Sequence, residues 1–375
     1  MRGDEVVIQG EVLAEMRVME GDAEVKDNGV SDLGKDDMVK KEVVENNRLL
    51  KGEEMKHGDA EVTMGYGVPE IDLSRVFSGD GENRRAVAKA MVEAWRTWGA
   101  FLVVNHGVDQ SVVEGAREQG MRVFALPMDN KLQAWREEGK FAGYGNGAGS
   151  KTTHSDDIGS ESFRVAYPGA DITNFAQKLW PGNCETFCED YEAYIAASQK
   201  LTVQLVELLS EGLSEEDGSH INSYFREPCV GSVRLNYYPA SATIGLPAHT
   251  DVAAFVLLHQ CDGGEGLQVE KNGQWVTVQA RSDAFVVIMG TVYQILTNGE
   301  YKAGRHRAIK GGNKDRLSMV FSLWPNPSLP MSPAPSFLAA HKQRLLYKPL
   351  TFPEFWDARE ADLLNPLKCI AVDAD

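Results

Sequence analysis

The sequence has no excess of positive charge and no long hydrophobic run. Its 375 residues contain 38 Lys and Arg against 55 Asp and Glu, a net charge of −17, which disfavours nucleic acid and anionic membranes as partners. No run approaches the roughly 18 apolar residues that a membrane span needs, and the N-terminus lacks the pattern of a secretory signal. We therefore expect a cytoplasmic protein that binds neither nucleic acid nor membrane.

Cysteine is scarce, and two common catalytic motifs are missing. The five cysteines show neither a CxxC pair nor the spacing of a disulfide framework, which favours reduced thiols. The chain has no GxSxG motif, which disfavours a serine hydrolase. The glycine-rich stretch at residues 141–150 is expected to be a loop. It lacks the following Lys-Ser or Lys-Thr and the preceding strand of a phosphate-binding loop.

The N-terminal segment differs in composition from the rest of the chain. Residues 1–66 are acidic and poor in aromatic side chains, and the first 62 residues hold 17 Asp and Glu against 9 Lys and Arg. Such a segment cannot bury enough apolar surface to offset the entropy that ordering would cost. We expect residues 1–66 to be a disordered acidic leader.

In the remaining chain, the spacing of the apolar residues changes once. Apolar residues follow helical spacing up to about residue 225, and seven short apolar runs separated by turn residues follow. This order predicts the α+β class, with a double-stranded β-helix (jelly roll) flanked by helices and preceded by an α/β cap. The expected segments are a helical and α/β domain at 67–225, a catalytic jelly roll at 226–330 and a helical segment at 331–375 that closes the pocket, with helices at 83–98, 110–124 and 184–213.

Polar residues interrupt the apolar run "PAHTDVAAFVLLHQ" at residues 247–260. If this run is one strand, His249 and Asp251 share a face, because side chains two residues apart in a strand point the same way. An imidazole beside a carboxylate forms half of a charge-relay pair or two ligands of a metal site. Since no nucleophile motif is present, a metal site is favoured, and it needs at least one more ligand.

Three further histidines are candidates for the third ligand. His259 lies about 33 Å from His249 along a straight strand at about 3.3 Å per residue. His341 lies in an amphipathic helix and is expected at the surface. His306 lies in a late strand, which a jelly roll can bring beside an early one. Two histidines and one carboxylate form the facial triad of non-haem Fe(II) oxygenases, so we predict His249, Asp251 and His306 as the metal ligands and catalytic residues.

The stretch "DRLSMVFSLW" adds an anion-binding pair. Arg316 and Ser318 are two residues apart in an apolar strand and therefore share a face. A buried guanidinium needs an anion and can hold a carboxylate through two parallel hydrogen bonds, while the serine hydroxyl adds another. Near an Fe(II) site, this pair predicts a cosubstrate that carries a carboxylate.

These motifs together resemble the plant-type 2-oxoglutarate- and Fe(II)-dependent dioxygenases, which have the isopenicillin N synthase-like fold, and in appearance most resemble gibberellin oxidases. The resemblance covers about residues 67–360 and is carried by "VPEIDLS", "WGAFLVVNHGV", "RLNYYP", "HTD", "GLQV", "GQWVTV", "TNGEYKAGRHRAI" and "RLS". It implies that Arg316 and Ser318 bind the distal carboxylate of 2-oxoglutarate with Tyr238 and Asn236 beside it, and that His106 is structural. It also implies Fe(II), 2-oxoglutarate and O2 as cofactor and cosubstrates, and ascorbate as a reductant.

The sequence departs from that family at positions near the expected pocket. The loop at 239–249 is shorter than usual, Thr291 stands where an Asp is usual, and Ser322 replaces a frequent Phe on an inward face. Every predicted metal ligand is present, so these departures bear on the substrate and not on activity. We predict Tyr144, Phe255 and Ser322 as substrate contacts.

The resemblance implies hydroxylation of a small hydrophobic metabolite, with release of succinate and CO2. The segments "RLNYYP" and "GYGN…ESFRVAYP" look most like the gibberellin-oxidase branch, which implies a gibberellin-type diterpenoid acid. A flavonoid or another specialised metabolite is the alternative substrate. A barrel that binds a small ligand without catalysis is a third reading; it predicts damage to the triad or to Arg316, and the sequence shows none. We expect a monomer.

Overall fold

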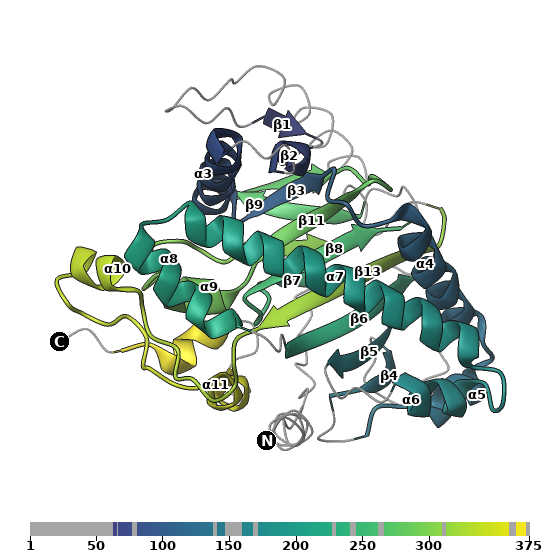
Figure 1. Ribbon diagram of the computed structural model, residues 1–375. Helices are drawn as coiled ribbons and strands as arrows, with labels where there is room; N and C mark the ends of the chain where they lie inside the picture. Colours follow the sequence, from purple (N-terminus) through teal and green to yellow (C-terminus); the bar gives the residue numbers. More distant parts are fainter. Residues whose placement is uncertain are drawn as a thin grey trace, which may run out of the picture.

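Two β-sheets form the centre of the protein, and helices cover the outer face of the larger sheet (Figure 1). The structure is a computed structural model that describes residues 63–65, 67–76, 81–137, 141–146, 160–167, 172–226, 230–240, 245–261, 266–309, 313–359 and 365–372. The predicted acidic leader at 1–66 lies almost wholly outside the described residues.

The larger sheet contains nine strands in the described part of the chain, in the order β1-β2-β3-β11-β8-β13-β6-β5-β4. Neighbouring strands are antiparallel except for the parallel pair β2 and β3. The strands are β1 (Thr63–Gly65), β2 (Val68–Asp72), β3 (Ala100–Val104), β4 (Gly143–Asn146), β5 (Glu161–Tyr167), β6 (Val230–Tyr238), β8 (Phe255–Gln260), β11 (Ala284–Met289) and β13 (Arg316–Trp324).

The smaller sheet faces the larger one and has the order β10-β9-β12-β7, with antiparallel neighbours throughout. Its strands are β7 (Leu246–His249), β9 (Leu267–Lys271), β10 (Gln274–Val278) and β12 (His306–Ala308). Side chains from both sheets line one cavity, which therefore lies between them. The two facing sheets with flanking helices confirm the predicted α+β jelly-roll class.

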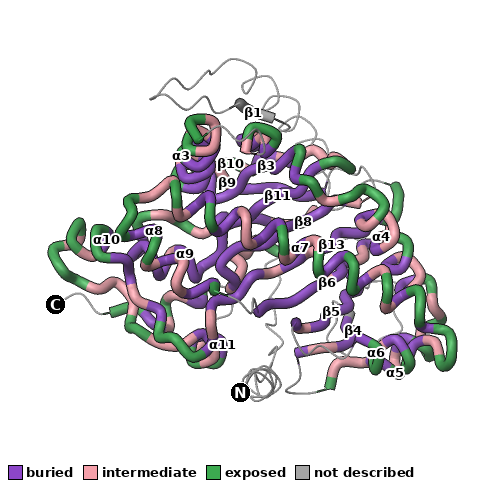
Figure 2. Tube along the Cα trace, viewed as in Figure 1, coloured by how far each residue is buried: buried purple, intermediate pink, exposed green. Residues whose placement is uncertain are grey.

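Several helices pack on the face of the larger sheet that points away from the cavity, while Trp356 of α11 lines the cavity itself. The longest, α7, crosses β13 and contacts α3 and α4 (Figure 1). Buried chain runs through the strands and the inner turns of α7, while the outward turns of the helices are exposed (Figure 2). The helices are α3 (Gly81–Trp98), α4 (Gln110–Ala125), α5 (Met128–Gln133), α6 (Ile172–Leu179), α7 (Glu185–Glu211), α8 (Glu215–Asn222), α9 (Thr291–Leu296), α10 (Pro335–Ala340) and α11 (Phe352–Ala358), with 3-10 turns at Leu73–Val76, Ser223–Phe225 and Pro366–Ile370.

Three helix predictions agree with the structure, whereas a fourth helix prediction and two strand predictions are wrong. His341 was predicted within a helix, but α10 ends at Ala340 and His341 lies in the turn that follows. The helices expected at 83–98, 110–124 and 184–213 correspond to α3, α4 and α7. The glycine-rich stretch expected to be a loop contains β4, because pairing with β5 supplies the backbone hydrogen bonds that the local sequence does not specify. The run at 247–260 is not one strand: β7 ends at His249 and β8 begins at Phe255, with a turn between them.

The larger sheet takes strands from both sides of residue 226. The predicted segments at 67–225 and 226–330 therefore share one sheet, while the described part of 331–375 adds no strand to it. The boundaries of all three segments stay a prediction. No described helix is long and apolar enough to cross a membrane.

Candidate metal and cosubstrate site

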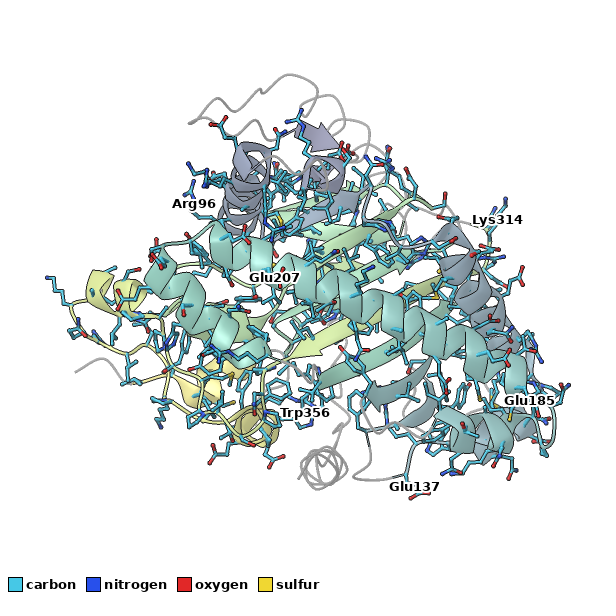
Figure 3. The ribbon with its side chains drawn as sticks, in the orientation of Figure 1. Arg96, Glu137, Glu185, Glu207, Lys314 and Trp356 are labelled. Atoms are coloured by element: carbon cyan, nitrogen blue, oxygen red, sulfur yellow. The ribbon has the colours of Figure 1, made fainter. Side chains whose placement is uncertain are left out.

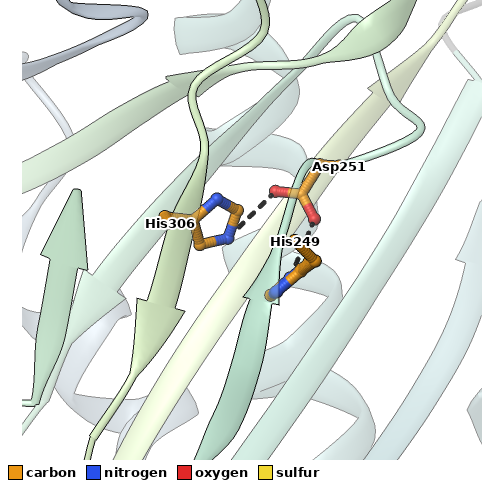
Figure 4. A group of neighbouring side chains, drawn as sticks. All are labelled: His249, Asp251 and His306. Atoms are coloured by element: carbon orange, nitrogen blue, oxygen red, sulfur yellow. Dashed lines mark ion pairs between the residues drawn. The ribbon is translucent and has the colours of Figure 1, made fainter. Parts of the chain in front are cut away.

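The structure brings His249, Asp251 and His306 together (Figure 4), and all three line the cavity. His249 is the last residue of β7, His306 is the first residue of β12, and the two are direct partners in the ladder between these strands. Asp251 lies in the turn after β7. Nε2 of His249 is 3.7 Å from Oδ1 of Asp251, and Nε2 of His306 is 3.6 Å from Oδ2. Strand pairing therefore assembles residues that lie far apart in the sequence.

The three side chains fit a single small cation. Their candidate ligand atoms all lie within 4.8 Å of one another. Two ligand atoms about 2.1 Å from one ion are about 3 Å apart when they subtend a right angle, and farther apart at wider angles. Separations of 3.6 and 3.7 Å need little movement to reach that geometry. Two imidazoles and one carboxylate leave coordination positions open, as non-haem Fe(II) chemistry requires.

Backbone carbonyls fix both imidazole rings. Nδ1 of His249 donates to the carbonyl of Pro247 at 2.8 Å, and Nδ1 of His306 donates to the carbonyl of Gly304 at 3.1 Å. Because a carbonyl only accepts, Nδ1 carries a proton in both rings, and Nε2 is the nitrogen that faces Asp251 and can bind a metal. Desolvation lowers the pKa of His249 to about 4, and the neighbouring His306 also lowers it. Near pH 7 the His249 ring is therefore neutral, which is the form that binds a metal.

The turn that carries Asp251 is held by the start of α9. The backbone N–H of Thr291 donates to the carbonyl of Asp251 at 2.9 Å, and that of Gly290 donates to Ala254 at 2.7 Å. A Cβ at Gly290 would lie 2.0 Å from the carbonyl oxygen of Ala253, so this close approach requires glycine. Thr291 thus supports the metal-site turn through its backbone, while its own side chain is buried and does not line the cavity.

The four residues predicted for 2-oxoglutarate line the same cavity as the triad. Arg316 and Ser318 of β13 lie directly opposite Tyr238 and Asn236 of β6 in the sheet. Cζ of Arg316 is 4.2 Å from the centre of the Tyr238 ring, and Nδ2 of Asn236 donates to Oγ of Ser318 at 3.5 Å. Burial raises the pKa of Tyr238, so its hydroxyl keeps its proton and can donate to a carboxylate. These groups can together hold an anion beside the candidate metal ligands.

The cavity extends beyond these groups and has a volume of about 280 Å³. Its further walls are apolar and aromatic residues together with three arginines that sequence reasoning missed. Arg234 has the strand parity of Asn236 and Tyr238, which is the signal that could have found it. These walls include Phe141, Arg164, Arg234, Leu258, Val320, Trp324, Trp356 and Arg359.

The structure places only one of the three predicted substrate contacts in the cavity. Ser322 lines it, two residues from Val320 on β13. Tyr144 is fully buried elsewhere, and its hydroxyl donates to Glu161 at 2.5 Å. Phe255 is also fully buried and stacks on Tyr293, with ring centres 6.2 Å apart. The predictions for Tyr144 and Phe255 need correction because strand alternation turns Phe255 away from the cavity and β4 turns Tyr144 toward the helices.

The other histidines considered as ligands lie outside the metal site. Nε2 of His259 donates to the carbonyl of Ser282 at 3.1 Å, in agreement with a strand-end histidine bonded to backbone. Nδ1 of His106 accepts from the backbone N–H of Val108 at 3.1 Å, as expected for a structural turn histidine. His341 is partly exposed, with Nε2 3.9 Å from Glu300. Their backbone and surface contacts explain these three residues without a metal.

Two protein families match the chain, one over its N-terminal half and one over its C-terminal half. Residues 68–183 match the non-haem dioxygenase in morphine synthesis N-terminal family, and residues 229–325 match the 2OG-Fe(II) oxygenase superfamily. The second match contains the triad, Arg316 and Ser318. The first ends just before α7, and it contains β2, β3 and the NHG motif.

Several characterised proteins are similar to the chain over most of its length. Jasmonate-induced oxygenase 2 of Arabidopsis thaliana is 31% identical over 77% of this chain and 78% of that protein. Gibberellin 2-beta-dioxygenase 8 of the same plant is 29% identical over 79% and 83%, and its naringenin,2-oxoglutarate 3-dioxygenase is 30% identical over 83% and 86%. These relatives are named for different substrates.

Solved structures show the same architecture. The crystal structure of JOX2 in complex with 2OG, Fe and JA superposes with a TM-score of 0.65 at 26% identity, covering 88% of this chain and 97% of that one. Dioxygenase for auxin oxidation in rice superposes with a TM-score of 0.65 at 23% identity, covering 81% and 100%, and supports the fold alone. The chain belongs to the 2OG-Fe(II) oxygenase superfamily and is a plant-type 2-oxoglutarate- and Fe(II)-dependent dioxygenase.

Proposed function

We propose that the enzyme holds Fe(II) with His249, Asp251 and His306, holds 2-oxoglutarate with Arg316 and Ser318, and hydroxylates a small hydrophobic metabolite. The observation that carries this proposal is that both groups open into one cavity between the two sheets. Tyr238 and Asn236 would add hydrogen bonds to the cosubstrate. When bound, the metal and 2-oxoglutarate supply the oxidising chemistry with O2, giving succinate and CO2 as co-products.

The chain's own contribution is to position the reactants and to exclude water. The hydrogen bonds from Nδ1 of His249 and His306 hold both Nε2 atoms toward Asp251, so little movement is needed when the ion binds. The aromatic wall formed by Phe141, Trp324 and Trp356 offers an apolar surface to the substrate. Removing water from such a cavity protects a reactive centre from side reactions.

A gibberellin-type diterpenoid acid is the substrate that we propose first. The resemblance of the sequence to gibberellin oxidases and the 29% identity to gibberellin 2-beta-dioxygenase 8 support it. A jasmonate-type acid is the second candidate, because the similar JOX2 structure contains JA and the cavity of about 280 Å³ favours a compact substrate. A flavonoid remains the alternative from another chemical class.

The test is a substrate screen with purified protein, Fe(II), 2-oxoglutarate and ascorbate. Diterpenoid acids, jasmonate-type acids and flavonoids are incubated separately, and the products are read by the mass gain of one oxygen atom and by release of succinate. We expect oxidation of an acid coupled to stoichiometric succinate. Oxidation of flavonoids alone would reject the proposed substrate class. The absence of any 2-oxoglutarate turnover would reject the proposed ligand assignments, with His306→Ala as the inactive reference.

The proposal includes a monomer located in the cytoplasm. The acidic composition supports the location. Size-exclusion chromatography with light scattering would test the monomer, and imaging of a tagged full-length chain would test the location.

A further inference from the structure

Two serine residues face the cavity from neighbouring strands of the larger sheet. Ser232 of β6 and Ser322 of β13 are direct partners in the ladder between these strands, and both line the cavity. Their other neighbours in the same row of the sheet are apolar, since Ala166 on β5 lies opposite Ser232 and Val256 on β8 lies opposite Ser322. The two serines therefore place a pair of hydroxyls within an otherwise apolar row.

Within the part of the chain that the structure describes, neither serine hydroxyl has a hydrogen-bond partner. Ser232 is only 4% exposed, so its hydroxyl is almost wholly removed from solvent. A polar group in such a place costs free energy unless a hydrogen bond satisfies it. Direct cross-strand partners have Cβ atoms about 4.5–5.5 Å apart, so one ligand atom between the two side chains can contact both hydroxyls.

The serine pair is separate from the residues proposed for 2-oxoglutarate. Ser322 and Arg316 are six residues apart on β13, which is about 20 Å along the strand at about 3.3 Å per residue. Ser232 and Tyr238 are likewise six residues apart on β6. A five-carbon molecule bound at Arg316 cannot reach the serines, so the serine pair is available to the primary substrate.

The serine pair lies within the length of a small molecule from the candidate metal ligands. The backbone N–H of Ala254 donates to the carbonyl of Leu323, the residue after Ser322, at 2.8 Å. Ala254 is three residues from Asp251, and three residues span at most about 11 Å. A substrate that contacts the serines can therefore place another of its atoms beside the metal ligands.

Aromatic rings border the serine pair on one side. Trp324 follows Ser322 by two residues on β13 and also lines the cavity. Its ring centre lies 5.2 Å from that of Phe141 and 5.6 Å from that of Trp356, which projects from α11 (Figure 3). Hydrogen bonds are stronger in such water-poor surroundings than in water. The combination suits a ligand with an apolar body that carries a neutral polar group.

The donor and acceptor capacity of two hydroxyls selects the kind of ligand atom. Each serine hydroxyl can donate one hydrogen bond and accept others. Both can donate to the oxygen of a ketone, or one can donate to a substrate hydroxyl while the other accepts from it. A hydrocarbon segment in the same position would leave both serine hydroxyls without a partner, which is unfavourable.

We infer that Ser232 and Ser322 bind a neutral oxygen substituent, a ketone or a hydroxyl group, on the primary substrate. The inference rests on the proposed function and deepens it, because it selects substrates that carry such a group over their deoxygenated analogues. Contact with the serine pair would fix which carbon atom of the substrate faces the metal ligands. A phenylalanine at position 322 would offer no such hydrogen bond.

The inference is tested with substrates that differ by one oxygen substituent. Diterpenoid acids and jasmonate-type acids are each used as a set of three, namely the ketone, the hydroxyl compound and the deoxygenated compound. Wild-type protein, Ser232→Ala and Ser322→Ala are assayed by succinate release and by the mass gain of one oxygen atom. In the wild type, kcat/KM should be about tenfold higher for an oxygenated compound than for its deoxygenated analogue. Each variant should lower this ratio about threefold to tenfold, because one hydrogen bond between neutral groups is lost. Ser219→Ala, which removes an exposed hydroxyl of α8, is the control.

Further measurements separate failure of this inference from failure of the proposed function. Melting temperatures of the anaerobic complex with Fe(II) and 2-oxoglutarate are recorded with each compound, so that binding is compared even without turnover. Equal kcat/KM and equal thermal stabilisation for all three members of both sets would overturn the inference. Unchanged ratios in both alanine variants would also overturn it, and a lower melting temperature of the ligand-free variants would then assign the serines to fold stability. The absence of 2-oxoglutarate turnover in the wild type with every compound would instead reject the proposed function.

Discussion

A single methyl group at position 266 should displace the guanidinium that we assign to 2-oxoglutarate. Gly266 precedes β9 and lies against Arg316 of β13. A Cβ built at Gly266 would be 2.4 Å from both Cζ and Nε of Arg316. Non-bonded heavy atoms prefer separations of about 3.5–4.0 Å, so the guanidinium would have to move by about 1 Å or more. Gly266→Ala therefore perturbs the anion site without changing any residue that contacts the cosubstrate.

The expected change in the KM for 2-oxoglutarate follows from the hydrogen bond that movement of the guanidinium would break. Hydrogen bonds to charged groups contribute about 1.5–3 kcal/mol, which corresponds to roughly a tenfold to a hundredfold change in an equilibrium constant. We expect the KM for 2-oxoglutarate to rise by that factor, with kcat at saturating 2-oxoglutarate changing less. The melting temperature should fall only slightly, because the atoms that clash belong to the far end of a flexible side chain.

The assay is succinate release as a function of 2-oxoglutarate concentration in the presence of Fe(II). Gly81→Ala is the matched control, since a Cβ at Gly81 would meet no atom within 4 Å. Arg316→Lys should raise the KM similarly, because an ammonium group cannot form the two parallel hydrogen bonds of a guanidinium. An unchanged KM in Gly266→Ala, with normal melting temperature, would refute the assignment of Arg316 to the cosubstrate.

Three other perturbations test separate parts of the structure. His249→Ala should abolish both iron binding, measured by metal analysis, and iron-dependent turnover; retained stoichiometric iron would remove His249 from the ligand set. Tyr144→Phe should lower the free energy of unfolding by about 1–3 kcal/mol in urea, because a buried carboxylate loses a donor. Substrate preference should be unaltered, and an altered preference would place Tyr144 in the pocket after all. Burial tends to raise the pKa of Asp217, but hydrogen bonds from Ser214 and Ser336 outweigh it and hold that pKa below its usual value. These bonds therefore stabilise the fold above about pH 4 and are lost as the pH falls through the lowered pKa. Asp217→Asn should lower the free energy of unfolding by about 1–3 kcal/mol at pH 7 and by less in acid. A loss of stability that does not depend on pH would contradict this account.

The candidate metal site shows that side chains predicted to meet from an incorrect local picture can still lie together. His249 and Asp251 were expected to share a face of one strand, yet the chain turns after His249. The two side chains still meet, because residues two apart stay close whether the chain continues or turns. The position of His306 depends instead on the ladder between β12 and β7, which joins residues separated by more than fifty positions.

The substrate contacts show where local sequence gives too little information. Alternation along a strand predicts which residues share a face, but it does not say which of the two faces borders the cavity. For β8 the cavity face carries Leu258, and Phe255 packs against Tyr293 of α9. Arg164 belongs to a different strand from Arg234, and only the pairing of β5 with β6 brings the two together.

The sequence by itself determined the family and the helices α3, α4 and α7, and it predicted the set of residues that we propose for the metal and the cosubstrate. These follow from side-chain types at short or ordered spacings, which survive errors in local secondary structure. Only the tertiary structure decided which strands adjoin, that the HTD segment lies in a turn held by α9, and that three further arginines share one cavity. The physical reason is that cross-strand hydrogen bonds and sheet packing join distant segments, and their register is set by the whole fold and not by any one stretch of the chain.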